Sequence, residues 1–595
     1  MSEPNRVVIA RMSSDLDAIS AYLNRVATDL GELGRMLDRA PVPTPPPAPP
    51  PKPVRAATVR SQTPAPPPER SEGWIGKALA AAGVTVTLTG VVLLLVLAAQ
   101  AGILRPEFRV AAGAVLAAVL VGAGWALHRR PDGRTGAIAL AATGIAAAYM
   151  DVIAVTSIYH WAPAPIGLAL AAAVGGVGLM LARRWNAQNL GMLVLVPLIA
   201  LAPAITDGVT LLLIGFMLAL SAAALPVQVG RDWLWLYAAR TVAATGPLLI
   251  ALVATTIGGH HDLMLALACA VAAVLALGSG LLTLRWTTRP AATAVWTAGG
   301  VLPLLCVSAA VDRVISALMV AALAAALVAI VALADRLPGV SATVRQVWTV
   351  LAAVAALVAV LVAFDGEVSG PVVLAMATVI AIGGRHGGVT RWIAVGMAVV
   401  GGAIFLDSAG PEMLVDATEL PGGLMVSVLA SSLLAIAAAA AIGWAFSSGE
   451  LIDREVIRLV WAVAAVVAGY AVTVFTVTAG VAISGVQAGF FGGHMAATIC
   501  WIAAAAGLLG YAARQPKAHR SLLIGGGMTL VAAATAKLFL FDLGTLDGMF
   551  RVAVFIVVGL ALLGMGAGYA RLLNQQDQGI ARSDMSANTT PSILD

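Results

Sequence analysis

After residue 76 the chain alternates long apolar segments with short polar gaps, and the alternation continues to residue 571. A helix needs about 20 apolar residues to cross a bilayer. By that criterion we expect spans near residues 77–103, 108–128, 135–158, 164–182, 188–206, 209–229, 234–258, 263–284, 291–310, 314–334, 344–364, 370–383, 391–407, 421–445, 456–479, 489–513, 521–541 and 549–571. The pattern therefore predicts an all-α, polytopic integral membrane protein with about 18 transmembrane helices. The short segments 370–383 and 391–407 are also compatible with half-crossings.

Basic residues fall in every second gap of this pattern. The even-numbered gaps hold Arg129, Arg130, Arg134, Arg183, Arg184, Arg231, Arg240, Arg285, Arg289, Arg336, Arg345, Arg385, Arg391, Arg454, Arg458, Arg514, Lys517 and Arg520. The odd-numbered gaps hold only Arg105, Arg109, Arg313 and Arg551, together with several acidic residues. Because positive charge is retained on the cytoplasmic side, we expect both termini in the cytoplasm. The alternation supports an even number of spans.

The composition agrees with a membrane protein. Hydrophobic residues make up 60% of the chain and charged residues 11%, so lipid is the solvent that suits most of its surface. The net charge of +5 follows from the basic gaps, and we expect no nucleic-acid partner. Tryptophans beside these gaps are expected to anchor at the membrane interface: Trp185, Trp233, Trp235, Trp286, Trp348 and Trp392.

The first 72 residues differ from the rest. Within residues 1–40, apolar residues alternate spacings of four and three at Met12, Leu16, Ile19, Leu23, Val26, Leu30, Leu33 and Leu37. This pattern predicts a cytoplasmic coiled-coil helix that supports a homo-oligomer. An amphipathic helix on the membrane surface is the alternative.

Two further segments flank the predicted transmembrane domain, residues 73–571. Residues 41–72 form a proline-rich linker, in which 13 of the chain's 30 prolines lie between residues 41 and 68. Such a stretch favours extended polyproline II structure and forms a semi-stiff tether. The polar tail, residues 572–595, is expected to be a disordered cytoplasmic segment.

The sequence contains no convincing phosphate-binding loop, zinc-ligand helix, nucleophile elbow or pair of cysteines. We therefore predict no catalytic residue, no cofactor and no metal site. The sequence favours a protein that is not an enzyme. The adjacent His260 and His261, followed by Asp262, are better explained by a solvated loop than by a metal site.

Two charges lie inside predicted spans, where an ionised side chain costs at least about 2.5 to 3.5 kcal/mol. Asp151 interrupts the third span and Lys537 the seventeenth. At about 1.5 Å per residue they lie roughly 10 Å and 6 Å below the outer ends of their helices. Similar depths allow an ion pair between them. The alternatives are that they only pin helices together, or that Lys537 reaches outward to water.

Other candidate functional charges cluster near the same outer boundary. Asp542, Asp547 and Arg551 follow Lys537, and Arg109 and His494 are predicted at similar depth. The longest outer loop, residues 407–419, is strongly acidic. If these groups converge, they form a charged site that faces outward.

Short motifs stand near the two ends of the predicted transmembrane domain. They are Trp74-Ile75-Gly76, Gly102, Arg109-Val110 and Arg129-Arg130 near its start, and Lys537-Leu538-Phe539-Leu540-Phe541-Asp542-Leu543, Leu546 and Phe550-Arg551-Val552 near its end. In these residues the chain resembles the bacterial multi-spanning membrane proteins known as domain of unknown function 2339. The resemblance covers residues 72 to 571 and implies a coiled-coil or proline-rich cytoplasmic front end. It implies no activity, but it directs attention to Arg109, Lys537, Asp542 and Arg551.

Three functions are compatible with these features. The first is a transporter or flippase-like protein for an amphipathic cell-envelope component in a bacterial inner membrane, with membrane lipid as its environment. The second is a non-enzymatic scaffold that gathers envelope-assembly proteins through residues 1–72. The third, a membrane-embedded glycosyltransferase, is disfavoured because the first outer loop offers only Glu107 where such enzymes carry an acidic pair.

Overall fold

The computed structural model describes residues 105–130, 133–258, 262–449, 452–515, 520–543, 548–549, 551–565 and 567. The predicted coiled coil (1–40), the proline-rich linker (41–72), the first span (77–103) and the tail (572–595) lie outside these residues, as do His260, His261 and Asp547. Every regular element in the described ranges is a helix.

The first half of the described chain contains α3 (Pro106–His128), α4 (Arg134–Ile153), the π-helix η1 (Ala154–Ile158), α5 (Ala164–Trp185), α6 (Gln188–Ile205), α7 (Leu211–Gln228), α8 (Leu234–Gly258), α9 (Leu263–Thr283), α10 (Pro290–Leu305) and η2 (Val307–Ala309). The second half contains α11 (Arg313–Ala332), η3 (Ala334–Arg336), α12 (Ala342–Ala363), α13 (Gly366–Gly383), α14 (Gly388–Ser408), η4 (Pro411–Leu414), α15 (Gly422–Ser447), α16 (Arg454–Ser484), α17 (Val486–Arg514), α18 (Arg520–Lys537) and the π-helix η6 (Leu538–Asp542).

Sixteen helices in the described ranges are long and apolar enough to cross a membrane, and they coincide one for one with the second to seventeenth predicted spans. The segments predicted at 370–383 and 391–407 are α13 and α14, with 18 and 21 residues, so each has the length of a full crossing. A further apolar helix, Arg551–Met565, falls within the predicted eighteenth span.

Helix boundaries follow the local sequence. The Asp262 carboxylate accepts hydrogen bonds from the Met264 and Leu265 amides at 2.9 and 3.1 Å and so caps α9. Thr210 and Ser341 cap α7 and α12 in the same way. Such caps satisfy amide groups that have no partner within the helix.

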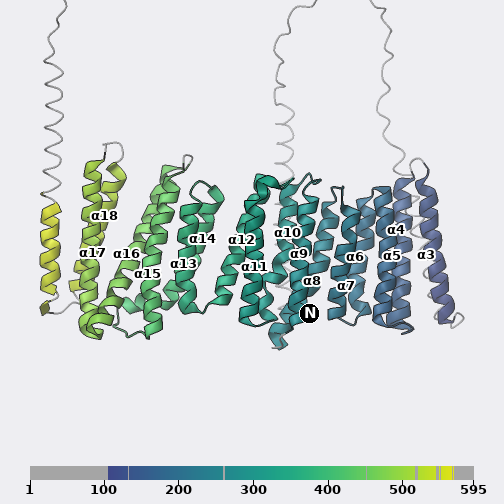
Figure 1. Ribbon diagram of the computed structural model, residues 1–595, viewed down its shortest axis with the longest axis horizontal. Helices are drawn as coiled ribbons and strands as arrows, with labels where there is room; N and C mark the ends of the chain where they lie inside the picture. The colour runs from purple at the N-terminus through teal and green to yellow at the C-terminus, as the bar shows by residue number, and fades with distance from the viewer. Residues whose placement is uncertain are drawn as a thin grey trace, which may run out of the picture. The chain divides into compact units, whose positions relative to one another are not determined.

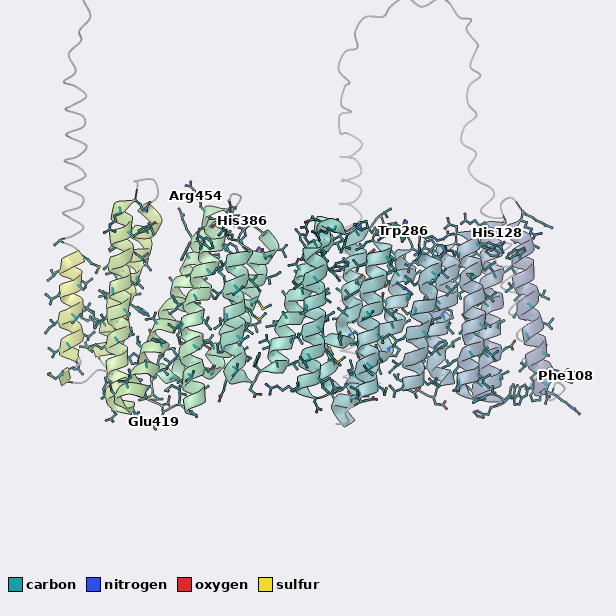
Figure 2. All side chains as sticks on the ribbon, in the orientation of Figure 1. Phe108, His128, Trp286, His386, Glu419 and Arg454 are labelled. Atoms are coloured by element: carbon teal, nitrogen blue, oxygen red, sulfur yellow. The ribbon has the colours of Figure 1, made fainter. Side chains whose placement is uncertain are left out.

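The helices alternate in direction, which gives the bundle two chemically different ends. Figure 2 shows His128, Trp286, His386 and Arg454 at one end, hereafter the basic end, and Phe108 and Glu419 at the other, hereafter the acidic end. The even-numbered gaps of the sequence lie at the basic end and the odd-numbered gaps at the acidic end. The charge alternation is thus a property of the two ends of the bundle.

Helices pack mainly on their neighbours in the sequence (Figure 1). The most extensive contacts include α3 with α4, α15 with α16, and α16 with α17, and α17 also packs on α18. Val554 and Val558 of the final helix join Ile502 and Leu538 in one apolar cluster. The neighbourhood of Lys537 is therefore built from α17, α18 and the last helix.

Several arginines at the basic end bond to helix carboxyl ends. Arg134 Nη2 donates to the carbonyls of Trp185 and Asn186 at 3.1 and 3.0 Å, where α5 ends. Arg231 Nη2 donates to the Arg183 carbonyl at 2.7 Å. A cation placed here satisfies terminal carbonyls and opposes the negative end of the helix dipole. These arginines therefore hold neighbouring helices together as well as setting the charge of this end.

The tryptophans divide into two groups. Trp235, Trp286 and Trp392 are exposed, as an interfacial belt requires. The expectation was wrong for Trp185, Trp233 and Trp348, which are buried. Trp185, for example, stacks on the His128 ring, with centroids 4.4 Å apart. Proximity to a basic gap did not distinguish a ring facing lipid from one packed between helices.

The α16–α17 hairpin turns at a single residue. Gly485 lies between the two helices with φ +79°, a left-handed conformation that favours glycine. Close to the turn, a Cβ on Gly480 would collide with the Gly489 carbonyl, and one on Gly493 would collide with the Val477 backbone. Glycine thus lets the two backbones touch, and this contact fixes the part of α17 that carries His494.

Candidate functional site

Lys537 and Asp542 are brought together by the π turn that ends the α18 segment. In an α-helix, residues five apart point about 140° away from each other, since each residue turns the helix by about 100°. A π-helix closes hydrogen bonds between residues five apart. Because η6 occupies Leu538–Asp542, the two side chains face the same side of the backbone.

Lys537 and Asp542 form a polar network with Thr498 of α17. Lys537 Nζ donates to Asp542 Oδ1 at 2.6 Å, to Thr498 Oγ1 at 2.9 Å and to the His494 carbonyl at 3.3 Å. The Thr498 hydroxyl donates to Asp542 Oδ2 at 2.6 Å. The three ammonium protons and both carboxylate oxygens therefore have partners, as a buried ion pair requires.

The network is shielded from solvent. The Asp542 side chain is 0% exposed and the Lys537 side chain 12%, and both Thr498 and His494 are buried. The His494 ring meets the Phe490 ring edge to face, with centroids 4.6 Å apart. It also faces the Leu414 backbone in η4. His494 thus connects the ion pair to the chain segment that covers the acidic end.

A cavity of about 230 Å³ lies beside this cluster, at the acidic end. Leu414 and Phe490, which both lie against the His494 ring, line it, and Glu419 is the charged group in its wall. The remaining lining is apolar apart from Thr418 and Thr478. The Phe490 and His494 rings lie between the buried ion pair and a cavity whose surface is partly polar and partly apolar.

Asp151 lies elsewhere, on α4 against α3. A Cβ added to Gly113 would overlap the Asp151 carboxyl group, so the carboxylate occupies the space that glycine leaves open. Similar depth left open an ion pair between Asp151 and Lys537, but the structure pairs Lys537 with Asp542 instead. Similar depth in the membrane did not bring the two together, because α4 packs on α3, α5 and α6, whereas α18 packs on α17.

The other predicted charges lie either near Asp151 on α3 or near Lys537 at α17, α18 and the helix that follows. Arg109 lies in the first turns of α3, near the Asp151 region. His494 and Asp542 join Lys537, and Arg551 begins the helix Arg551–Met565. The structure thus assembles three of the six candidate charges, Lys537, Asp542 and His494, in one cluster.

Sequence reasoning missed Thr498 and misplaced Arg240. Thr498 gave no signal, since threonine is common in membrane helices. Arg240 was assigned to a basic gap, but it lies inside α8 and is 2% exposed. Its Nη1 donates to the Ser221 carbonyl at 3.3 Å, and its guanidinium lies over the Tyr237 ring. Its position within the apolar run 234–258 was the signal for burial.

No group of three or more histidine, cysteine, aspartate or glutamate side chains suited to a metal ion occurs among the residues that the structure describes. The chemistry of the α17–α18 cluster is that of ion pairing and hydrogen bonding.

These features define an all-helical membrane protein with many apolar helices and a buried polar cluster. A comparison with protein families matches residues 76–406 and 388–572 to the family described as predicted membrane protein, domain of unknown function 2339. The match spans most of the chain, and the protein belongs to this family. Comparisons with curated proteins and with solved structures found no match.

Proposed function

We propose that the protein is a transporter or flippase-like protein for an amphipathic component of the cell envelope. The observation that carries the proposal is the Lys537–Asp542 pair, buried with Thr498 and His494 beside the cavity at the acidic end. We further propose that the basic end faces the cytoplasm of a bacterial cell and that the cavity opens toward the outer leaflet.

A buried ion pair is an expensive way to hold two helices together. Replacing such a pair by apolar residues of similar size is often neutral or stabilising, and charges within membrane segments commonly mark a pathway. In this cluster the headgroup of a substrate can replace either Lys537 or Asp542 as the partner of the other. The apolar part of the same substrate then lies in the adjoining cavity. The mixture of charge and apolar lining suits an amphipathic substrate.

A scaffold is the alternative proposal. It depends on residues 1–72, which lie outside the described residues, and it treats the ion pair as a structural pin. It predicts that deletion of residues 1–72 abolishes function, whereas a transporter keeps partial activity without them.

The decisive experiment is complementation of a strain that lacks the gene, with membrane abundance measured for each variant. The informative variant is the double substitution Lys537→Met with Asp542→Leu, which removes both charges together, so that neither is left buried without the other. We expect it to accumulate normally and fail to complement. A double variant that complements fully would overturn the transport proposal, because the charges would then serve structure alone.

Direct transport is measured in proteoliposomes that contain the purified full chain and an acyl-labelled fluorescent phosphatidylglycerol. Movement between leaflets is read as the fraction of label that becomes accessible to a reductant outside. We expect faster movement than in protein-free vesicles, and a return to the protein-free rate in the double variant. Equal rates with and without protein would argue against lipid movement.

The proposed orientation is tested by cysteine labelling in a variant whose Cys269, Cys306 and Cys500 are replaced by alanine. Asp416→Cys at the acidic end should react with a membrane-impermeant maleimide in intact cells. Ser448→Cys at the basic end should react only after the membrane is opened. The reverse pattern would invert the topology.

A further inference from the structure

A second hollow lies on α4 between α3 and α5, apart from the α17–α18 cluster. It measures about 530 Å³, and its lining is apolar except for Asp151. Ala114 and Val121 of α3 form one side and Leu170 and Leu181 of α5 the other. Along α5 this lining extends for roughly 16 Å at 1.5 Å per residue. It is a groove of the length and polarity that suit an apolar chain.

The Asp151 carboxylate lies toward one end of this groove, with Val152 and Val155 of the lining beyond it along α4 and η1. Its Oδ2 is shielded from solvent and has no hydrogen-bond partner among the residues that the structure describes. An acceptor in apolar surroundings without a partner is costly. A ligand that donates a hydrogen bond or brings a positive charge to this oxygen therefore gains binding free energy here.

The order of polar and apolar groups along the groove sets the direction of the ligand. Asp151 lies near the acidic end of α4, and the lining then runs through Ile145 and Val121 toward the basic end. A lipid-like molecule bound from the acidic side keeps its polar group near that end, and its apolar chain extends toward the membrane centre. The groove has the same order.

We propose that this groove binds an amphiphile that carries an amine, with the ammonium on Asp151 and the apolar chain between α3 and α5. Charge complementarity selects the amine, since the single charged group of the lining is a carboxylate.

The test uses photoactivatable hexadecylamine, hexadecanoic acid and hexadecanol, each with a diazirine in the chain, added to the full chain in lipid nanodiscs. Labelled peptides are identified by mass spectrometry. We expect the amine to label α3, α4 and α5 preferentially, and Asp151→Asn to reduce that labelling about tenfold, the effect of losing one charge-assisted hydrogen bond.

A matched pair of variants on α3 tests the location. Ala118 lines the groove, whereas its neighbour Val119 is exposed outside the lining. Ala118→Trp should block labelling by the amine, and Val119→Trp should leave it unchanged. Equal labelling by the amine and the acid, labelling that survives Asp151→Asn, or no labelling of these helices would each overturn the proposal. The last result is expected if another part of the chain or a second copy covers the groove.

Discussion

Asp151 and Lys537 are both charged side chains within membrane helices, but their surroundings differ. Each is a charge in a membrane helix near the acidic end, and each is followed closely by a π turn, η1 or η6. Lys537 finds a carboxylate within its own π turn and a hydroxyl on α17. Asp151 finds a glycine and an apolar groove. Depth and charge therefore do not determine the environment of a buried ion; the local backbone and the facing helix do.

The largest effect is expected where the charge is already paired. Asp542→Ala leaves the Lys537 ammonium buried without its counterion, and breaking a buried pair in this way costs about 3 to 5 kcal/mol. We expect a clear loss of membrane abundance and of thermal stability in detergent. The double variant, Lys537→Met with Asp542→Leu, should recover most of the loss. If Asp542→Ala is as stable as the parent, the network does not stabilise the fold.

The Asp151 region should be sensitive to bulk. Gly113→Val inserts a side chain where the carboxyl group lies, and overpacking of this kind costs about 1 to 3 kcal/mol. Gly122→Val is the control, because a Cβ at that position on the same helix meets nothing within 4 Å. Adding Asp151→Ala should restore part of the stability lost in Gly113→Val. Equal unfolding temperatures for the two glycine variants would contradict the described contact.

Thr498 links the two charges from the neighbouring helix. Thr498→Val keeps the shape of the side chain but removes its hydrogen bonds with Lys537 and Asp542, so a loss of about 1 kcal/mol is expected. Thr529→Val serves as the control, since that hydroxyl is exposed and bonds only within α18. Thermal unfolding of both variants measures the difference, and an equal change in the two would place Thr498 outside the network.

The smallest effect is expected at the basic end, far from either membrane charge. Partial burial alone would raise the pKa of Asp232, but hydrogen bonds from Thr288 and Thr287 and the charge of Arg289 outweigh it and lower the pKa. The stability that this carboxylate contributes is therefore present above its unfolded pKa, near 3.9, and is lost as the pH falls through the lower folded value. Asp232→Asn should be slightly less stable than the parent at pH 7 and should converge with it in strong acid. A difference that does not depend on pH would exclude the titration.

Much of the architecture was predictable, because the bilayer imposes a length and a composition on each crossing. The sixteen described spans fell where hydropathy placed them, and the basic gaps converged at one end. The Lys537–Asp542 pair was not predicted, since a spacing of five residues separates two side chains on an ordinary helix. Thr498 and the Gly113 contact depend on which helices adjoin, and Arg240 shows that a charge near a span end can lie inside it.

The π turn η6 also affects how this segment would respond to the deletion of one residue. A π turn holds one residue more than an α turn, so η6 is equivalent to an α-helix with a single-residue insertion. Deleting Leu540, which is 86% exposed, would leave the lysine and the aspartate four apart, a spacing that faces one side of an ordinary helix. The ion pair can therefore tolerate the loss of one codon here, while the chain that follows is rotated relative to α17. A one-residue deletion at this point would therefore reorient the helix Arg551–Met565 without separating the charged pair.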